Sequence, residues 1–227
     1  IATDRTKMED QYAVELMDLL RLYKLEAAAF RGAILSSVVP PLNHALCGAV
    51  KKATGLTPLL VGPGTKTGLN IRIDNPSQTG ADLVVGAVAA LRFHKAPMIV
   101  IDMGTATTMV ALDKNGALIG GCICPGVKIS LDALTDRTSL LPGIQLDQPK
   151  KAIGRNTIDC MRSGLMMGAA CMIDGMIDRI TEEVGEPLPV YATGGLAPVI
   201  TPYCRHAITL DEHLVLKGLY LLYQKNT

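Results

Sequence analysis

Three threonines that follow an acid and a glycine are the residues of this 227-residue chain best suited to chemistry. An apolar run at 98–101 predicts a buried strand, and Asp102 comes directly after it. A carboxylate at the end of a strand can face a cation, and the glycine lets the backbone turn close to a ligand. Thr105, Thr107 and Thr108 add hydroxyl and backbone N–H groups that suit phosphate. The alternative is an ordinary hairpin with a threonine-rich bend.

A second acid, Asp82, ends the polar loop 74–82 and precedes the segment 83–93. That segment is almost entirely small and aliphatic, which predicts a buried helix. An acid in this position can be a helix N-cap stabilised by the helix dipole, and the spacing alone favours that interpretation. The functional alternative is a carboxylate free to accept a proton from a substrate hydroxyl.

Alternating strands and helices position these two acids. Helices are predicted over 8–23, 42–54, 83–93, 127–134, 158–184 and from 214, the first with Thr6 and Glu9 as a capping box. Strands are predicted over 30–39, 59–61, 70–73, 98–101, 109–112, 117–119, within 120–126, and over 189–192 and 206–209. The order predicts an α/β protein of two domains, residues 1–96 and 97–227. The glycine-rich loop 62–68 lacks the Walker spacing and is interpreted as a structural turn.

Composition narrows the class of function. The chain has 22 basic and 21 acidic residues, with no basic cluster, so we expect no nucleic-acid partner. No apolar run reaches membrane-spanning length and no signal peptide is visible, so we expect no membrane association. The six cysteines are scattered, which predicts buried free thiols in a cytoplasmic protein.

An ordered set of motifs adds a family resemblance. The motifs are Asn-Pro at 75–76 with Gly-Ala-Asp at 80–82, Asp-Met-Gly-Thr at 102–105, Gly-Gly at 120–121 with Pro-Gly at 125–126, Gly-Arg-Asn-Thr at 154–157 with Ser-Gly at 163–164, and Thr-Gly-Gly at 193–195. In this order they resemble the type III pantothenate kinases, a family that also contains the Bvg accessory factor proteins. The resemblance runs from Ile1 almost to the end of the chain.

The resemblance implies ATP-dependent phosphorylation of pantothenate to 4'-phosphopantothenate, the first step of coenzyme A biosynthesis. It implies a two-domain acetate/sugar kinase–Hsp70–actin (ribonuclease H-like) fold. It also implies a cytoplasmic homodimer that uses Mg²⁺ with ATP and depends on a monovalent cation, K⁺ or NH₄⁺.

Matching the motifs position by position carries the family's roles onto this sequence. Asp82 matches the general base, Asp102 the ligand of the monovalent cation, and Thr105 an ATP-phosphate contact. The positions that match the pantothenate site, besides Asp82 itself, are Ile73, Gly80, Ala81, Leu83 and Thr157. The turn at 193–195 resembles the nucleotide-side glycine turn of the fold.

Three departures from the family pattern accompany the match. Leu83 stands where the family often has Arg, and Ile73 stands where it usually has an aromatic residue. The family's opening strand and Asp-x-Gly-Asn-Thr phosphate loop are expected just before Ile1, so the first strands of the first domain are missing. We therefore expect the printed chain alone to be inactive. The alternative is a non-catalytic or regulatory nucleotide-binding member of the same family.

Overall fold

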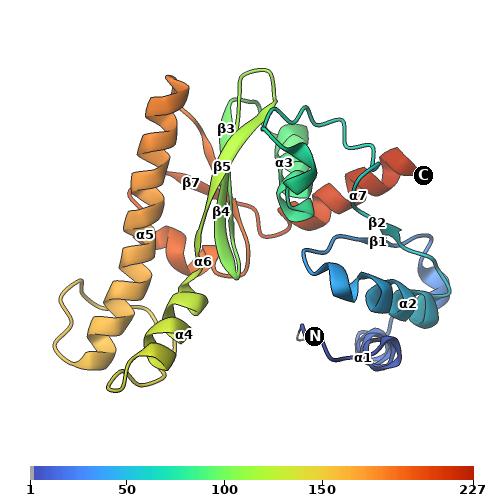
Figure 1. Cartoon of the computed structure of the whole chain (residues 1–227), viewed down its shortest axis with the longest axis horizontal. Helices are drawn as coiled ribbons and strands as arrows, with labels where there is room; N and C mark the ends of the chain where they lie inside the picture. The colour runs from blue at the N-terminus through green and yellow to red at the C-terminus, as the bar shows by residue number, and fades with distance from the viewer. Residues whose placement is uncertain (1–2) are drawn as a thin grey trace.

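A five-stranded mixed sheet is the centre of the molecule. The computed structural model describes residues 3–227 (Figure 1). The strands lie in the order β5-β4-β3-β6-β7, with β3 antiparallel to β4 and parallel to β6. Their bounds are β3 Met98–Met103, β4 Ala106–Leu112, β5 Leu118–Pro125, β6 Val190–Thr193 and β7 Ile208–Leu210. The strands predicted over 98–101, 109–112 and 189–192 are therefore confirmed.

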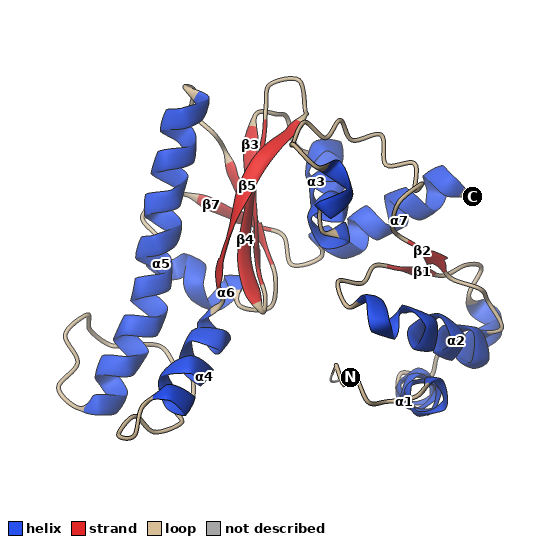
Figure 2. Ribbon diagram, viewed as in Figure 1, coloured by secondary structure: helices blue, strands red, loops and turns tan. Residues whose placement is uncertain are grey.

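Helices cover both faces of this sheet (Figure 2). One face carries α4 (Val127–Arg137), α5 (Thr157–Val184) and α6 (Ala197–Ile200), and the other carries α3 (Ala81–Phe93) and α7 (Leu214–Asn226). Successive residues of β3 point to opposite faces of the sheet. Ile99 therefore packs in the hydrophobic cluster on the α5 side, and Val100 packs in the cluster on the α3 side. Burial on both faces explains why β3 is a continuous apolar run.

A smaller unit precedes the large sheet along the chain. It holds α1 (Glu9–Leu22), α2 (Asn43–Thr54) and a two-stranded parallel sheet of β1 (Ile34–Leu35) and β2 (Leu59–Leu60). The helices α1 and α2 pack together through Tyr12, Ala13, Leu42 and Ala49. As predicted, α2 ends at Gly55, whose φ of 77° is left-handed.

The last helix, α7, joins the two parts of the molecule. Leu222 of α7 packs with Val61 and Val85, and the pair α3 and α7 approaches so closely that a Cβ on Gly218 would lie 2.2 Å from the backbone oxygen of Val85. The side chain of Asn226 bonds the backbone of Lys66, which supports the interpretation of loop 62–68 as a structural turn. The division into domains 1–96 and 97–227 stays a prediction.

Several local predictions for the first part of the chain are wrong. The cap of α1 is Met8, whose backbone N–H donates to Oε1 of Gln11 at 2.8 Å, while Thr6 bonds Asp4 instead. The strand predicted over 30–39 shrinks to β1, because β2 offers partners for two residues only. The strand predicted over 70–73 is a single bridge from Ile71 to Leu118, the first residue of β5.

The cysteines differ from the prediction in their exposure. All six thiols are free, but Cys160 and Cys171 are exposed and the other four are partly buried. The predicted burial is therefore wrong, while the absence of disulfides within residues 3–227 agrees with the expected free thiols. No helix in this described part is long and apolar enough to cross a membrane.

Candidate active site

Asp82 lies in the first turn of α3 and is not its N-cap. The helix begins at Ala81, Gly80 is the cap residue, and Oδ1 of Asp82 accepts the backbone N–H of Leu83 at 2.9 Å. The N-cap interpretation is therefore wrong. A negative charge in the first turn is stabilised by the helix dipole. A side chain at position 80 would place its Cβ 2.5 Å from Oδ1 of Asp82, so Gly80 leaves this carboxylate its space.

Asp102 is brought beside Asp82 by the packing of α3 on β3. The Asp102 side chain is partly buried at the end of β3, and burial first, then the charge of Asp82, raises its pKa. Two acids that are 20 residues apart in the sequence thus share one region of the fold. Such a pair of carboxylates favours a cation between or beside them.

The glycine turn at 193–195 packs against Asp102. Asp102 pairs with Thr193 across the parallel strands β3 and β6. Gly194 follows with φ 98°, and a Cβ there would lie 2.5 Å from Oδ1 of Asp102. The backbone N–H of Leu196 donates to the carbonyl of Met103 at 3.1 Å. The turn predicted at 193–195 therefore lies directly against the acid-glycine-threonine turn.

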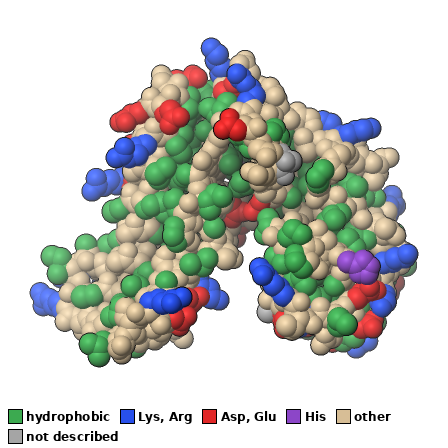
Figure 3. Space-filling model, viewed as in Figure 1, with side chains coloured by type: hydrophobic (Ala, Val, Ile, Leu, Met, Phe, Trp, Pro, Cys, Tyr) green, Lys and Arg blue, Asp and Glu red, His purple; other side chains and the backbone are tan. Residues whose placement is uncertain are grey.

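A cavity of about 430 Å³ opens beside Asp82. Four residues predicted for the pantothenate site line it, namely Ile73, Gly80, Asp82 and Leu83. Ala81 lines a neighbouring cavity of about 290 Å³ on the side of loop 62–68. In Figure 3 the molecule is hollowed between the half that holds α4 and α5 and the half that holds α1 and α2, and acidic side chains lie at the closed end of the hollow.

Two threonine hydroxyls in the cavity wall are not among the residues predicted for the pantothenate site. Thr79 and Thr108 line the cavity, and their Oγ1 atoms are buried without a hydrogen-bond partner. A buried hydroxyl without a partner is costly in a folded protein, so these groups are suited to a ligand. Thr108 belongs to the threonine cluster seen in the sequence, but nothing in the sequence separates it from the buried Thr107. No sequence signal marks Thr79.

The remaining two predicted residues lie outside this cavity. Thr105 is exposed in the turn between β3 and β4, next to Asp102 in the chain. Thr157 is the exposed first residue of α5, on the face of the sheet opposite α3. It lines a separate cavity of about 440 Å³ with residues of α4 and α5. Within one chain, the structure does not bring Thr157 to Asp82.

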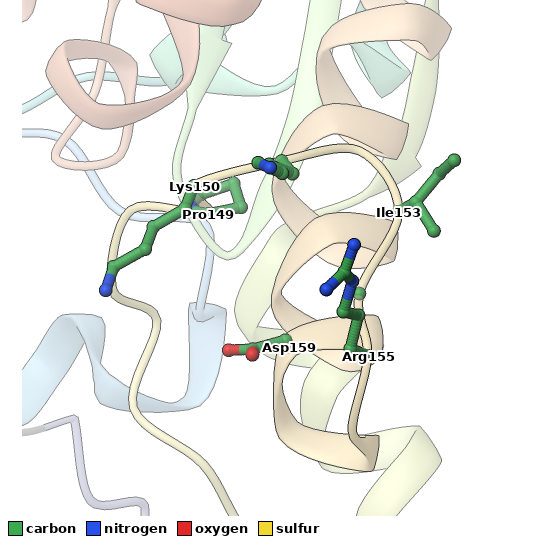
Figure 4. Close-up of a pocket in the computed structure, with 7 residues that line it drawn as sticks. Pro149, Lys150, Ile153, Arg155 and Asp159 are labelled. Atoms are coloured by element: carbon green, nitrogen blue, oxygen red, sulfur yellow. The ribbon is translucent and has the colours of Figure 1, made fainter.

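The loop that leads into α5 carries a group of basic side chains. Lys150, Lys151 and Arg155 line a cavity of about 210 Å³ together with Asp159 (Figure 4). The side chain of Asn156 caps α5 by accepting the backbone N–H of Asp159 at 2.9 Å. This cap fixes the start of the helix and therefore the position of Thr157.

The donor set at Asp102 suits a weakly held cation. Within residues 3–227 no cluster of three or more His, Cys, Asp or Glu side chains is placed to hold a metal ion. Asp102 offers a carboxylate at a strand end, and a Cβ built on Gly194 would lie 2.5 Å from its Oδ1 and 2.6 Å from the backbone oxygen of Met103. Oxygen ligands suit a hard cation, and with only the two carboxylates of Asp82 and Asp102 nearby in the described part of the chain they suit a cation of low charge.

Comparisons with known proteins agree with one another. A family model described as type III pantothenate kinase matches residues 1–179. A type III pantothenate kinase from Halalkalibacterium halodurans is 43% identical over 226 residues, which cover 100% of this chain and 89% of that protein. One from Moorella thermoacetica is 41% identical over 227 residues, with the same coverage.

A solved structure supports the fold. The crystal structure of a conserved putative Baf family transcriptional activator from Campylobacter jejuni matches with a TM-score of 0.52 at 20% identity. The match covers 74% of this chain and 81% of that one. The likeness shows that the two chains share a fold, and the α/β class expected from the sequence is confirmed by the mixed sheet with helices on both faces.

Proposed function

The chain belongs to the type III pantothenate kinase family, and from that premise we propose how its residues carry the reaction. The reaction is the ATP-dependent phosphorylation of pantothenate in coenzyme A biosynthesis, and it uses a divalent metal with ATP. The observation that carries the assignment of roles is the placement of Asp82 in a cavity wall with Asp102 close behind it.

Asp82 acts as the general base. Its carboxylate faces the cavity, where it accepts the proton from the pantothenate hydroxyl as that oxygen bonds to the γ-phosphorus of ATP. The bond from the γ-phosphorus to the bridging oxygen of ADP breaks in the same step, and ADP leaves. Phosphoryl transfer depends on positioning and on neutralised phosphate charge, so the base needs only to hold the hydroxyl in line.

Asp102 holds a monovalent cation, K⁺ or NH₄⁺, and Thr105 contacts the ATP phosphates. Burial and the charge of Asp82 raise the pKa of Asp102, and a cation beside its carboxylate would stabilise the ionised form. The monovalent cation at Asp102 and the divalent metal that accompanies ATP would together neutralise the negative charge of the phosphates. A titration of ADP release with KCl, NH₄Cl and NaCl, with and without pantothenate, tests both the function and the cation. Turnover that does not need pantothenate would contradict the assignment.

Thr108 binds the acceptor through its unpartnered hydroxyl. We expect Thr108→Val to raise the free energy of unfolding by ~1 kcal/mol. The substitution removes a buried hydroxyl without a hydrogen-bond partner, and with it the free-energy penalty of burying that group. The same change should lower kcat/KM for pantothenate by about tenfold, because a substrate group then lacks its partner. Urea unfolding and steady-state kinetics measure the two effects. Thr107→Val is the control. A fall in stability together with unchanged kinetics would show that the hydroxyl is structural.

A homodimer forms through α5 and brings Thr157 to the site of the partner subunit. The exposed face of this 28-residue helix is made of small side chains, which permit close approach of a second helix: Cys160, Gly164, Gly168, Cys171 and Gly175. Thr157 lies at one end of this face and away from Asp82 of its own chain. Two-fold symmetry lets each chain supply Thr157 to its neighbour.

Mixing two inactive variants tests this exchange. Asp82→Asn and Thr157→Val should each lose activity alone. Chains co-expressed with different tags should regain about a quarter of the wild-type activity, because half of the dimers are mixed and each has one intact site. Purified single-variant dimers are the controls. No gain above the two single variants would place Thr157 in the site of its own chain and reject the exchange.

We also propose a cytoplasmic location and a division into domains at residues 96 and 97. ATP as phosphoryl donor and six free thiols support the first. Two separate sheets, β1-β2 and β5-β4-β3-β6-β7, support the second.

A further inference from the structure

One side of the β4–β5 pair forms part of the wall of the cavity beside Asp82. Val110 of β4 packs in the hydrophobic cluster on the α3 side of the sheet, and Cys122 of β5 packs against the cluster on the α5 side. Because successive residues of a strand point to opposite faces, Ile123 lies on the α3 side, the side of the helix that carries Asp82. Val110 and Ile123 both line the cavity. This face of β4 and β5 therefore belongs to the candidate active site.

Ile123 is the residue of β5 directly opposite Thr108. The antiparallel register pairs the two residues across β4 and β5. The Cβ atoms of such a cross-strand pair are about 4.5–5.5 Å apart. Thr108 carries the buried hydroxyl without a hydrogen-bond partner, which binds the acceptor under the proposed function. An aliphatic side chain thus stands beside this hydroxyl, and the two can touch neighbouring atoms of one ligand.

The side chain of Ile123 keeps most of its apolar surface in water. Its exposed fraction is 73%, although it lines the cavity. Val38, in the loop after β1, lines the same cavity and is 63% exposed. Single exposed aliphatic side chains are common on protein surfaces, but here two of them line one cavity together with Asp82 and an unpartnered hydroxyl. A ligand with a branched apolar group would remove their surface from water.

The acceptor of the reaction carries such a group close to its reacting hydroxyl. In pantothenate the carbon that bears this hydroxyl is bonded to a quaternary carbon with a pair of methyl groups. The carbon on the other side of the quaternary centre bears the second hydroxyl of the molecule. The methyl groups are therefore equally close to both hydroxyl-bearing carbons. Whichever hydroxyl Thr108 binds, a side chain one cross-strand spacing away can reach the methyl groups.

We infer that Ile123 is a specificity-determining residue that packs on the methyl groups of the quaternary carbon beside the reacting hydroxyl. The inference rests on the proposed function of the Asp82 cavity and names the part of the acceptor that its β5 wall recognises. A quaternary carbon held against Ile123 fixes the direction of the hydroxyl attached next to it. The chemical step is unchanged, because the hydroxyl oxygen bonds to the γ-phosphorus, ADP leaves, and Asp82 takes the proton.

Kinetics of the full-length protein with two acceptors test this contact. ADP release is measured with pantothenate and with the analogue in which hydrogen atoms replace both methyl groups. We expect the wild type to favour pantothenate in kcat/KM by about tenfold or more, the range for apolar groups that fill a matching pocket. Ile123→Ala should lower kcat/KM for pantothenate by about tenfold and leave that for the analogue within about twofold. The preference for the methylated acceptor should then largely disappear.

Two further variants separate the contact from a loss of structure. Ile123→Val shortens the side chain and should keep an intermediate preference. Ile129→Ala truncates an isoleucine of α4 that is 42% exposed and does not line the cavity, so it should leave the preference unchanged. Because the side chain of Ile123 is largely exposed, Ile123→Ala should change the free energy of unfolding by no more than about 0.5 kcal/mol. Urea unfolding measures this effect.

Equal losses of kcat/KM for both acceptors in Ile123→Ala would overturn the inference, and so would an unchanged preference for pantothenate. If Ile123→Ala does not fold, Ile123→Val carries the test, and a preference equal to that of the wild type would then overturn the inference. A failure of the proposed function looks different, since neither acceptor would stimulate ADP release by the wild-type protein.

Discussion

Asp82→Asn lowers kcat by about 10²- to 10⁴-fold, the range typical for removal of a positioned general base. The amide keeps the size of the side chain and its ability to accept the Leu83 N–H, so α3 should start as before. It cannot take the proton from the acceptor hydroxyl. Because the loss arises in the transition state, we expect KM for pantothenate to change much less than kcat.

The control for this variant is Asp74→Asn. Asp74 is an exposed acid in the same polar loop and does not line the cavity, so its kcat should stay within about twofold of wild type. Single-turnover measurements with saturating ATP isolate the chemical step. A near-normal rate for Asp82→Asn in that assay would remove Asp82 from the role of base.

Asp102→Asn raises the K⁺ concentration for half-maximal activity by about 10- to 100-fold, because one charge contact near a protein surface is worth ~1–4 kcal/mol. Asp102 lies at the end of β3, where burial and the neighbouring charge of Asp82 raise the pKa of its carboxyl. KCl titrations of ADP release for both proteins measure the effect. An unchanged titration would reject the assignment of the cation to Asp102.

The pH dependence of cation affinity follows from the same pKa. Burial and the neighbouring Asp82 raise the pKa of Asp102, so its carboxyl keeps a proton to a higher pH than usual. Only the ionised form binds a cation well. Affinity for K⁺ should therefore rise as pH increases through this pKa and level off above it. In Asp102→Asn the affinity should not vary over this pH range.

Long apolar runs made most of the large sheet and its helices predictable. β3 and α3 are buried on nearly every side, so almost all their residues are apolar. The sequence therefore shows where each apolar run begins and ends. β1 was not predictable in length, because a strand ends where its partner ends and β2 pairs with two of its residues. Local sequence contains no information about a partner 25 positions away at Leu59 and Leu60.

Some residues of the candidate site could also be identified from the sequence, and others could not. The sequence motifs named Asp82 and Asp102, and the fold places the two close together. Spacing alone favoured Asp82 as an N-cap, because an acid before an apolar helix looks the same whether the helix starts one residue earlier or later. The burial of the hydroxyl of Thr79 depends on how its loop meets β4 and β5, and composition does not reveal that.

The close packing of Gly218 against Val85 fixes the order in which the protein can mature during synthesis. Domains form as the chain emerges, from its N-terminus onward. α3 carries Asp82, yet the helix that covers its outer side lies more than 120 residues later, from Leu214 to Asn226. Until those residues leave the ribosome, the apolar surface of α3 stays open. The helix that holds Asp82 therefore gains this packing contact only after α7 has been synthesised.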